Sequence, residues 1–361
     1  EMKGLNYLAL IVLVTMGNST FAMQEGLTAL TDTELSAETG QALFNMSYIA
    51  PGGSNPSADV GFYKLGMEAQ LDLNANIKKF QLGCGGFKGP GCDIDIDNLS
   101  FTGIVNPNTP DAGPASDFTL INPFYELAIK NPTSAATREV VGFRIGADSV
   151  WGMLSIGDPG SDPDSVSSHT GINSISGHLP TVIDNGIVPT TICTFAANDP
   201  TGCGFGGSVT STNSTINADD PNSGDNRFDL TLQRASRVTL NGIKVKSLLN
   251  LTITANLDQS LKFIHNITAG TDKNNNGKYD LDESAPNFGI SVQGQDVQWN
   301  TNGQWLNAQK GWWMELPESK IENFTTRRVY TTIGAVFGLD LKDLNQNQVP
   351  VDNCYGSLTF C

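Results

Sequence analysis

Apolar and polar residues alternate along much of this chain with the two-residue period of half-buried β-strands. Residues 93–97, which read DIDID, place Ile94 and Ile96 on one face and three aspartates on the other. The same alternation recurs at residues 249–254 and 337–341. These runs predict strands that bury one face and expose the other.

Clusters of Asn, Asp, Pro and Gly separate the alternating runs, at residues 106–114, 158–164 and 219–225. Short strands with such turns between them are typical of β-sandwiches, β-barrels and β-solenoids. No strict repeat period is present, so a regular solenoid is not indicated, and stacked irregular coils and irregular hairpins both stay open. The sequence predicts a mainly β fold: an irregular sandwich or β-solenoid-like body with a short N-terminal helix and long polar loops.

The expected helix lies in residues 30–41, where Thr31 and Glu34 form a capping box and Gly40 is a natural C-cap. Ahead of it, residues 2–22 have the pattern of a signal peptide. Lys3 is basic, residues 8–14 are apolar, and small residues lead to Ala22, so we expect a mature start near Met23. The apolar run is too short for a membrane-anchoring helix, which is the alternative.

The pattern divides the chain into four segments. Residues 2–22 are the signal peptide, and residues 23–50 contain the predicted helix. Residues 51–258 form a β-rich body, and residues 259–361 form a β-rich C-terminal region. The last boundary is placed where a segment rich in Trp and Asn begins.

The net charge of the chain narrows the classes of protein to which it can belong. The 361 residues include 21 Lys and Arg against 37 Asp and Glu, which gives a net charge of −16. Nucleic-acid binders need a basic surface to neutralise phosphates, so this composition argues against them. No segment after the signal peptide is apolar enough for a transmembrane span. We expect an exported protein of the periplasm, cell surface or extracellular space.

Six cysteines fit an oxidising compartment. They fall into close pairs joined by loops rich in Gly and polar residues, and the simplest of fifteen pairings is the local one. A metal–thiolate site is the alternative, but the chain has no C-x-x-C and its histidines are scattered. The predicted disulfides are Cys84–Cys92, Cys193–Cys203 and Cys354–Cys361.

Residues 272–283 match a calcium-binding loop. Hard oxygen ligands stand at alternate positions, Gly277 allows the sharp turn, and the last carboxylate can bind with both oxygens. The alternative is a metal-free turn between strands. Calcium is therefore the predicted cofactor, with the ligands Asp272, Asn274, Asn276, Lys278 (through its carbonyl), Asp280 and Glu283.

Four tryptophans concentrate near the C-terminus: Trp299, Trp305, Trp312 and Trp313. Exposed aromatic rings beside Asn and Gln can stack on sugars, which allows a glycan-binding face. The alternative, which we favour, is packing in a core or subunit interface, because Trp buries a large area.

Catalytic motifs are absent from the sequence. It has no G-x-S-x-G elbow, P-loop or H-E-x-x-H motif, and paired cysteines leave no thiol nucleophile. Acidic residues are plentiful, but nothing selects a catalytic pair. We therefore expect no enzyme.

The segment 30–41, LTDTELSAETGQ, lies directly after the signal peptide and resembles the start of FilA-type pilus-assembly and filament proteins of Gram-negative bacteria. Residues 93–103 are similar to the strand-rich body of these proteins. The resemblance implies an exported structural protein of the cell surface, a pilus subunit or assembly factor, with other surface or filament subunits as partners. The alternative is a secreted protein that binds glycans through the tryptophans.

Overall fold

The chain folds into sheets, as the alternation predicts. The computed structural model describes residues 44–104, 116–162, 164–194, 197–198, 202–204, 207–220, 224–246, 252–273, 279–332, 339–341 and 348–351. Within these ranges the protein is mainly β, with 26 strands and one short 3-10 helix, η1 (Leu261–Phe263). The predicted signal peptide, the predicted helix at 30–41 and the cysteines Cys354 and Cys361 lie outside the described residues.

The larger sheet has 13 strands and draws on both halves of the chain. Its strands are β1 (Phe44–Ile49), β2 (Val60–Met67), β3 (Gln70–Leu73), β4 (Ala75–Leu82), β5 (Ile94–Thr102), β6 (Phe118–Lys130), β7 (Glu139–Ile156), β8 (Ile172–Ile183), β15 (Arg227–Ala235), β18 (Asn266–Ala269), β19 (Ala285–Gln293), β22 (Gly311–Glu315) and β23 (Ser319–Ile321).

A second sheet has seven strands. They are β9 (Gly186–Cys193), β12 (Ser208–Ile216), β16 (Arg237–Lys246), β17 (Thr252–Ser260), β24 (Phe324–Thr325), β25 (Val329–Thr332) and β26 (Leu339–Leu341). Three two-stranded ribbons complete the described structure: β10 (Ala197–Asn198) with β11 (Gly202–Cys203), β13 (Asp219–Asp220) with β14 (Gly224–Asp225), and β20 (Val297–Thr301) with β21 (Gln304–Ala308).

Strand β7 organises the larger sheet because its 18 residues pair on both edges. Along one edge it pairs antiparallel with β6 and then with β5. Along the other edge it pairs with β19 and then with β18. Because β18 and β19 connect through β23, β22 and β8, the hydrogen-bonded path returns to β7.

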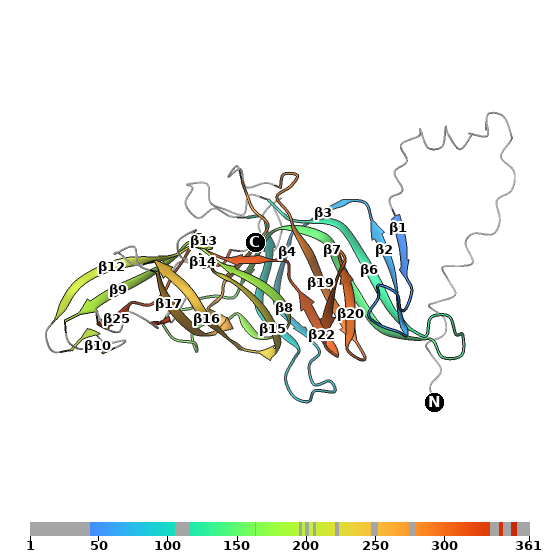
Figure 1. Cartoon of the computed structure of the whole chain (residues 1–361), viewed down its shortest axis with the longest axis horizontal. Coiled ribbons are helices and arrows are strands. Elements are labelled where there is room, and N and C mark those ends of the chain that lie inside the picture. Colours follow the sequence, from blue (N-terminus) through green and yellow to red (C-terminus); the bar gives the residue numbers. More distant parts are fainter. Residues whose placement is uncertain are drawn as a thin grey trace. The chain divides into compact units, whose positions relative to one another are not determined.

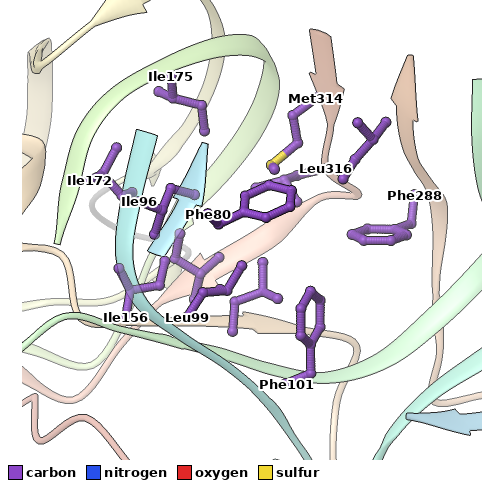
Figure 2. Close-up of a pocket in the computed structure, with 13 residues that line it drawn as sticks. Phe80, Ile96, Leu99, Phe101, Ile156, Ile172, Ile175, Phe288, Met314 and Leu316 are labelled. Carbon is purple, nitrogen blue, oxygen red and sulfur yellow. The ribbon is translucent and has the colours of Figure 1, made fainter. Parts of the chain in front are cut away.

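The two large sheets share one apolar core. It joins buried residues of the larger sheet, such as Ile96 and Leu154, with Leu240 and Leu257 of the seven-stranded sheet. Figure 2 shows a narrow cavity in this core, where Phe80, Ile96, Phe288 and Met314 point toward one another. The thirteen described residues that line it are all apolar, so none of them offers a polar group to orient a ligand.

The alternation at residues 93–97 is confirmed for the isoleucines and corrected for one aspartate. Ile94 and Ile96 are buried, while Asp95 and Asp97 lie half-buried on the other side of β5. Asp93 was expected beside them, but it is buried. The reason is a cluster of cations around it, described below.

Candidate assembly surface

One face of the larger sheet is open and apolar at the end formed by β1, β2, β6 and β7. Figure 1 shows β1, β2 and β6 side by side at this end. We call the exposed large apolar residues of these strands the open face: Phe44, Met46, Tyr48, Tyr63, Tyr125, Val140 and Ile145.

Strand register puts the open face on one side of the sheet, because directly paired residues point the same way. One row runs from Met46 through Leu65 and Tyr125 to Ile145. Its next member is Ile290 of β19, which packs against the main core. The open face therefore lies on the same side of the sheet as the main core, and it continues that apolar side beyond the region that other elements cover.

The exposure of these side chains is large. Met46 is 79% exposed, Phe44 57% and Ile145 58%. Tyr48 and Tyr63 stack with their ring centroids 4.4 Å apart, so the aromatic surface is contiguous. Because one aromatic side chain presents roughly 150–250 Å², the seven residues offer on the order of 700 Å². Typical monomers expose a largest apolar patch of about 300–600 Å².

Strand β1 borders the open face as an edge strand. In the described part of the chain it pairs with β2 alone, through the register Phe44↔Met67 to Ile49↔Phe62. The local sequence FNMSYI explains its geometry, because alternate positions place Phe44, Met46 and Tyr48 on the open face. An apolar edge strand of this kind is a template for association with another chain.

The opposite face of the same strands is covered. Val60, Phe62, Ala128 and Val141 pack under the β20–β21 hairpin in a second apolar core. This hairpin contributes the buried ring of Trp299, whose centroid lies 5.5 Å from that of Phe62. One side of this part of the sheet is thus sealed, while none of the described elements covers the other.

Arg144 fixes the hairpin to the sheet. Its guanidinium lies 5.1 Å from the ring centroids of both Phe124 and Trp299. It donates to Glu126 Oε2 at 2.6 Å, to the carbonyl of Asn300 at 2.7 Å and to Thr301 Oγ1 at 2.9 Å. These bonds bind β6, β7 and the hairpin together, so the covered face is held rigidly.

A second buried carboxylate, Glu315, lies 3.6 Å from Arg144 Nη1. Burial raises the pKa of Glu315, and the attraction of Arg144 only partly opposes this effect. One guanidinium serves two carboxylates, and Glu126 takes its shorter bonds. The cluster is therefore suited to anchoring the hairpin.

The tryptophans proposed for a glycan-binding face are largely packed. Trp299 and Trp313 are 1% and 2% exposed and belong to the second core. Trp305 is partly buried against that same core, and Trp312 packs against the main core. Sugar stacking needs accessible rings, so the burial favours the packing alternative.

Two of the three predicted disulfides lie in the described structure and are confirmed. They join Cys84 to Cys92 and Cys193 to Cys203. The first closes a loop that is also held from β15 by Arg234. This guanidinium donates to the carbonyls of Gly83, Lys88, Gly89 and Pro90, which line the loop.

Asp93 is the anion that holds Arg234 in place. Its Oδ1 accepts from Arg234 Nε at 2.9 Å and pairs with Lys88 Nζ at 3.2 Å. Its Oδ2 accepts the backbone N–H of Trp312 at 2.9 Å. Burial by itself would raise the pKa of Asp93, but these three donors outweigh it and lower the pKa. The charge of Asp93 is therefore compensated inside the fold.

The calcium-type loop is described at its two ends, while Asn274, Asn276 and Lys278 lie outside the described residues. Glu283 is buried, and its carboxylate joins the two arms of the loop. Oε1 accepts the N–H of Lys273 at 2.7 Å, and Oε2 accepts the N–H of Asp280 at 3.2 Å. Asp272 is half-buried and Asp280 is exposed. Glu283 thus occupies the closing position, and calcium binding stays a prediction.

Two histidines, His169 and His265, form a buried pair. The carbonyl of Ile156 lies 2.8 Å from His265 Nδ1, which must therefore carry the proton. His265 Nε2 then accepts from His169 Nδ1 at 3.2 Å. Burial lowers the pKa of His265, so its neutral form is favoured.

The described ranges contain neither a cluster of metal-ligating side chains nor a membrane-spanning helix. No three His, Cys, Asp or Glu side chains there form a group that could hold a metal ion. Among the same residues, no helix is long and apolar enough to cross a membrane.

Sequence reasoning missed the open face. The signal was present, because residues 44–48 and 63–67 alternate between apolar and small or polar positions. Alternation predicts which side chains share a face, but it does not tell whether another element covers that face.

Comparison with known protein families, with curated proteins and with solved structures found no match to this chain.

Proposed function

We propose that this protein is an exported structural protein of the cell surface, which acts as a subunit or assembly factor of a pilus or filament. The observation that carries the proposal is the open face: on the order of 700 Å² of contiguous apolar surface beside an edge strand. Surfaces of this size mark sites of interaction with other proteins.

Three further features support the proposal. The close disulfides fit an oxidising compartment outside the cytoplasm. The charge of −16 disfavours nucleic acid as the partner. The segment 30–41 resembles the start of FilA-type filament proteins. Buried tryptophans give the rival, a glycan-binding protein, no accessible platform at Trp299 and Trp313.

Shearing surface material from cells that produce the protein tests the proposal. We expect the chain to sediment with high-mass filaments and to be released only when those filaments are dissociated. Mass spectrometry of the sedimented fraction identifies the chain and its fellow subunits. Recovery of the protein solely as a free chain that binds sugars would contradict the proposal.

A further inference from the structure

We propose that the open face binds a second copy of this chain, open face against open face. This inference rests on the proposed function, since it names the partner of the same surface. Two sheets that pack face to face lie about 10 Å apart with strand directions within about 30°. Such a pair would bury both open faces in one interface.

The size of the face fits this partner. A stable protein–protein interface buries about 800 Å² on each side, and the open face offers on the order of 700 Å². Four of its seven members are Phe or Tyr, the residue types that dominate interface energies. Gly61 also lies on this side, where an added Cβ would come within 3.1 Å of the Tyr48 ring and of Pro132, so the ring of Tyr48 packs closely on β2.

The distribution of charge favours the open face as the place where two copies meet. Like-charged chains of −16 repel, so two copies meet most easily where neither carries charge. The open face consists entirely of uncharged residues. On the same strands, Lys64, Glu126 and Arg144 point to the opposite, covered side, where they pair with Asp148 or with one another. Charge is thus segregated away from the proposed contact.

The chain's own N-terminal segment is a poorer occupant. Residues 23–43 precede β1 directly and contain four carboxylates, no basic residue and no aromatic residue. Its large apolar residues are Met23, Leu27, Leu30, Leu35 and Leu43. Covering a face rich in aromatic rings with this segment would bring acidic side chains onto apolar surface, which costs free energy of desolvation.

Sedimentation equilibrium of the purified exported chain tests the inference. We expect a reversible dimer of the 38.5 kDa chain, reduced only by any loss of its N-terminal segment. Tyr125→Glu should weaken dimerisation at least about 100-fold, because a two-fold contact suffers each substitution twice. Ile145→Lys should act in the same way. Leu281→Glu is the matched control, since Leu281 is 84% exposed outside the open face, and it should leave the dimer intact.

Nitration of tyrosines tests whether a second copy of the chain or its own N-terminal segment covers the open face. In the dimer, Tyr48, Tyr63 and Tyr125 should be protected, and the Tyr125→Glu protein should expose Tyr48 and Tyr63. Circular dichroism checks that each variant keeps its fold. A monomer at every concentration overturns the inference, whether its tyrosines react or are shielded by its own N-terminal segment. If the chain still sediments with sheared filaments in that case, the proposed function survives with a different subunit on the open face.

Discussion

At the residue scale, Arg234 and Asp93 show how this fold accommodates buried charge. Arg234 donates to four loop carbonyls and to Asp93, and its backbone has a positive φ of 45°. The planar guanidinium presents five N–H donors on three nitrogens, whereas a lysine ammonium offers three donors from a single nitrogen. The disulfide loop thus depends on a side chain that lies 142 residues after Cys92 in the sequence.

Arg234→Lys should therefore destabilise the protein by about 2–4 kcal/mol, because the loop carbonyls lose most of their donors and Asp93 loses one of its three. Urea unfolding measures the change. The matched control is Arg237→Lys, whose pair with Asp258 is more than half exposed on both sides. That control should change stability by less than about 0.5 kcal/mol. Equal effects of the two substitutions would refute the role given to Arg234.

The lowered pKa of His265 predicts that the protein loses stability in mild acid. Its folded-state pKa is lowered from 6.5, mainly by burial. The unfolded chain therefore binds a proton below about pH 6.5 that the folded chain does not bind until lower pH. The free energy of unfolding should fall as the pH drops through this window, and it should stop falling at the lowered folded pKa.

Unfolding curves at pH 7.5 and 5.5 for the native protein and for His265→Gln measure this effect. The variant should lose less stability between the two pH values, although it is less stable at both. His178→Gln is the matched control because His178 lies outside the buried pair and bonds to Asp229. An unchanged pH dependence in His265→Gln would contradict the assignment. Glu315, whose pKa is raised, acts with the opposite sign in all three proteins.

At the scale of elements, local pattern predicted strands where one face is buried. The run 93–97 became the start of β5, and the alternation around Ile253 became the start of β17. The pattern did not predict where alternation breaks. Asn98 has a positive φ of 47°, and Leu99 directly after it turns into the core. Such breaks depend on the partner strand, which lies elsewhere in the sequence.

The candidate site was less predictable for the same reason. The disulfides of Cys84 and Cys193 are local, so spacing alone indicated them. Burial of Trp299 depends on Phe62, a residue more than 200 positions earlier in the chain. Whether the open face is covered depends on the whole arrangement of sheets. Sequence alone therefore predicts which residues share a face better than what lies upon it.

The calcium-type loop carries an element-scale prediction. If residues 272–283 bind calcium, the ion stabilises the fold by about 2.7 kcal/mol at a free concentration 100 times its dissociation constant. A chelator should then lower the melting temperature by several degrees. Equal melting curves with millimolar calcium and with chelator would leave the loop as a metal-free turn.

The Glu283→Gln variant tests whether the Glu283 carboxylate is a calcium ligand. The change costs stability even without calcium. The backbone N–H groups of Lys273 and Asp280 both donate to the Glu283 carboxylate, and in the glutamine variant one of them would face the amide NH₂ instead of an oxygen. The informative quantity is therefore the difference between melting temperatures with and without calcium. This difference should vanish in Glu283→Gln and persist in Asp282→Asn, whose exposed carboxylate pairs with Lys273.

At the scale of the whole molecule, charge and apolar surface act against each other in assembly. Each copy carries −16, so copies repel at long range, while the uncharged open face attracts at contact. Salt screens the repulsion and leaves the apolar contact in place. Association should therefore tighten as salt rises from about 0.02 to 0.5 M. Light scattering measures it, and weakening with salt would indicate an interface built on ion pairs instead.

The central claim is that the open face is buried between subunits in the assembled protein. Thiol labelling of Met46→Cys tests it directly, since the native cysteines are expected to be paired. In assembled material Met46→Cys should resist labelling, and after dissociation it should react fully. Leu281→Cys, exposed away from the open face, should react in both states. Equal labelling of Met46→Cys before and after dissociation would contradict the account.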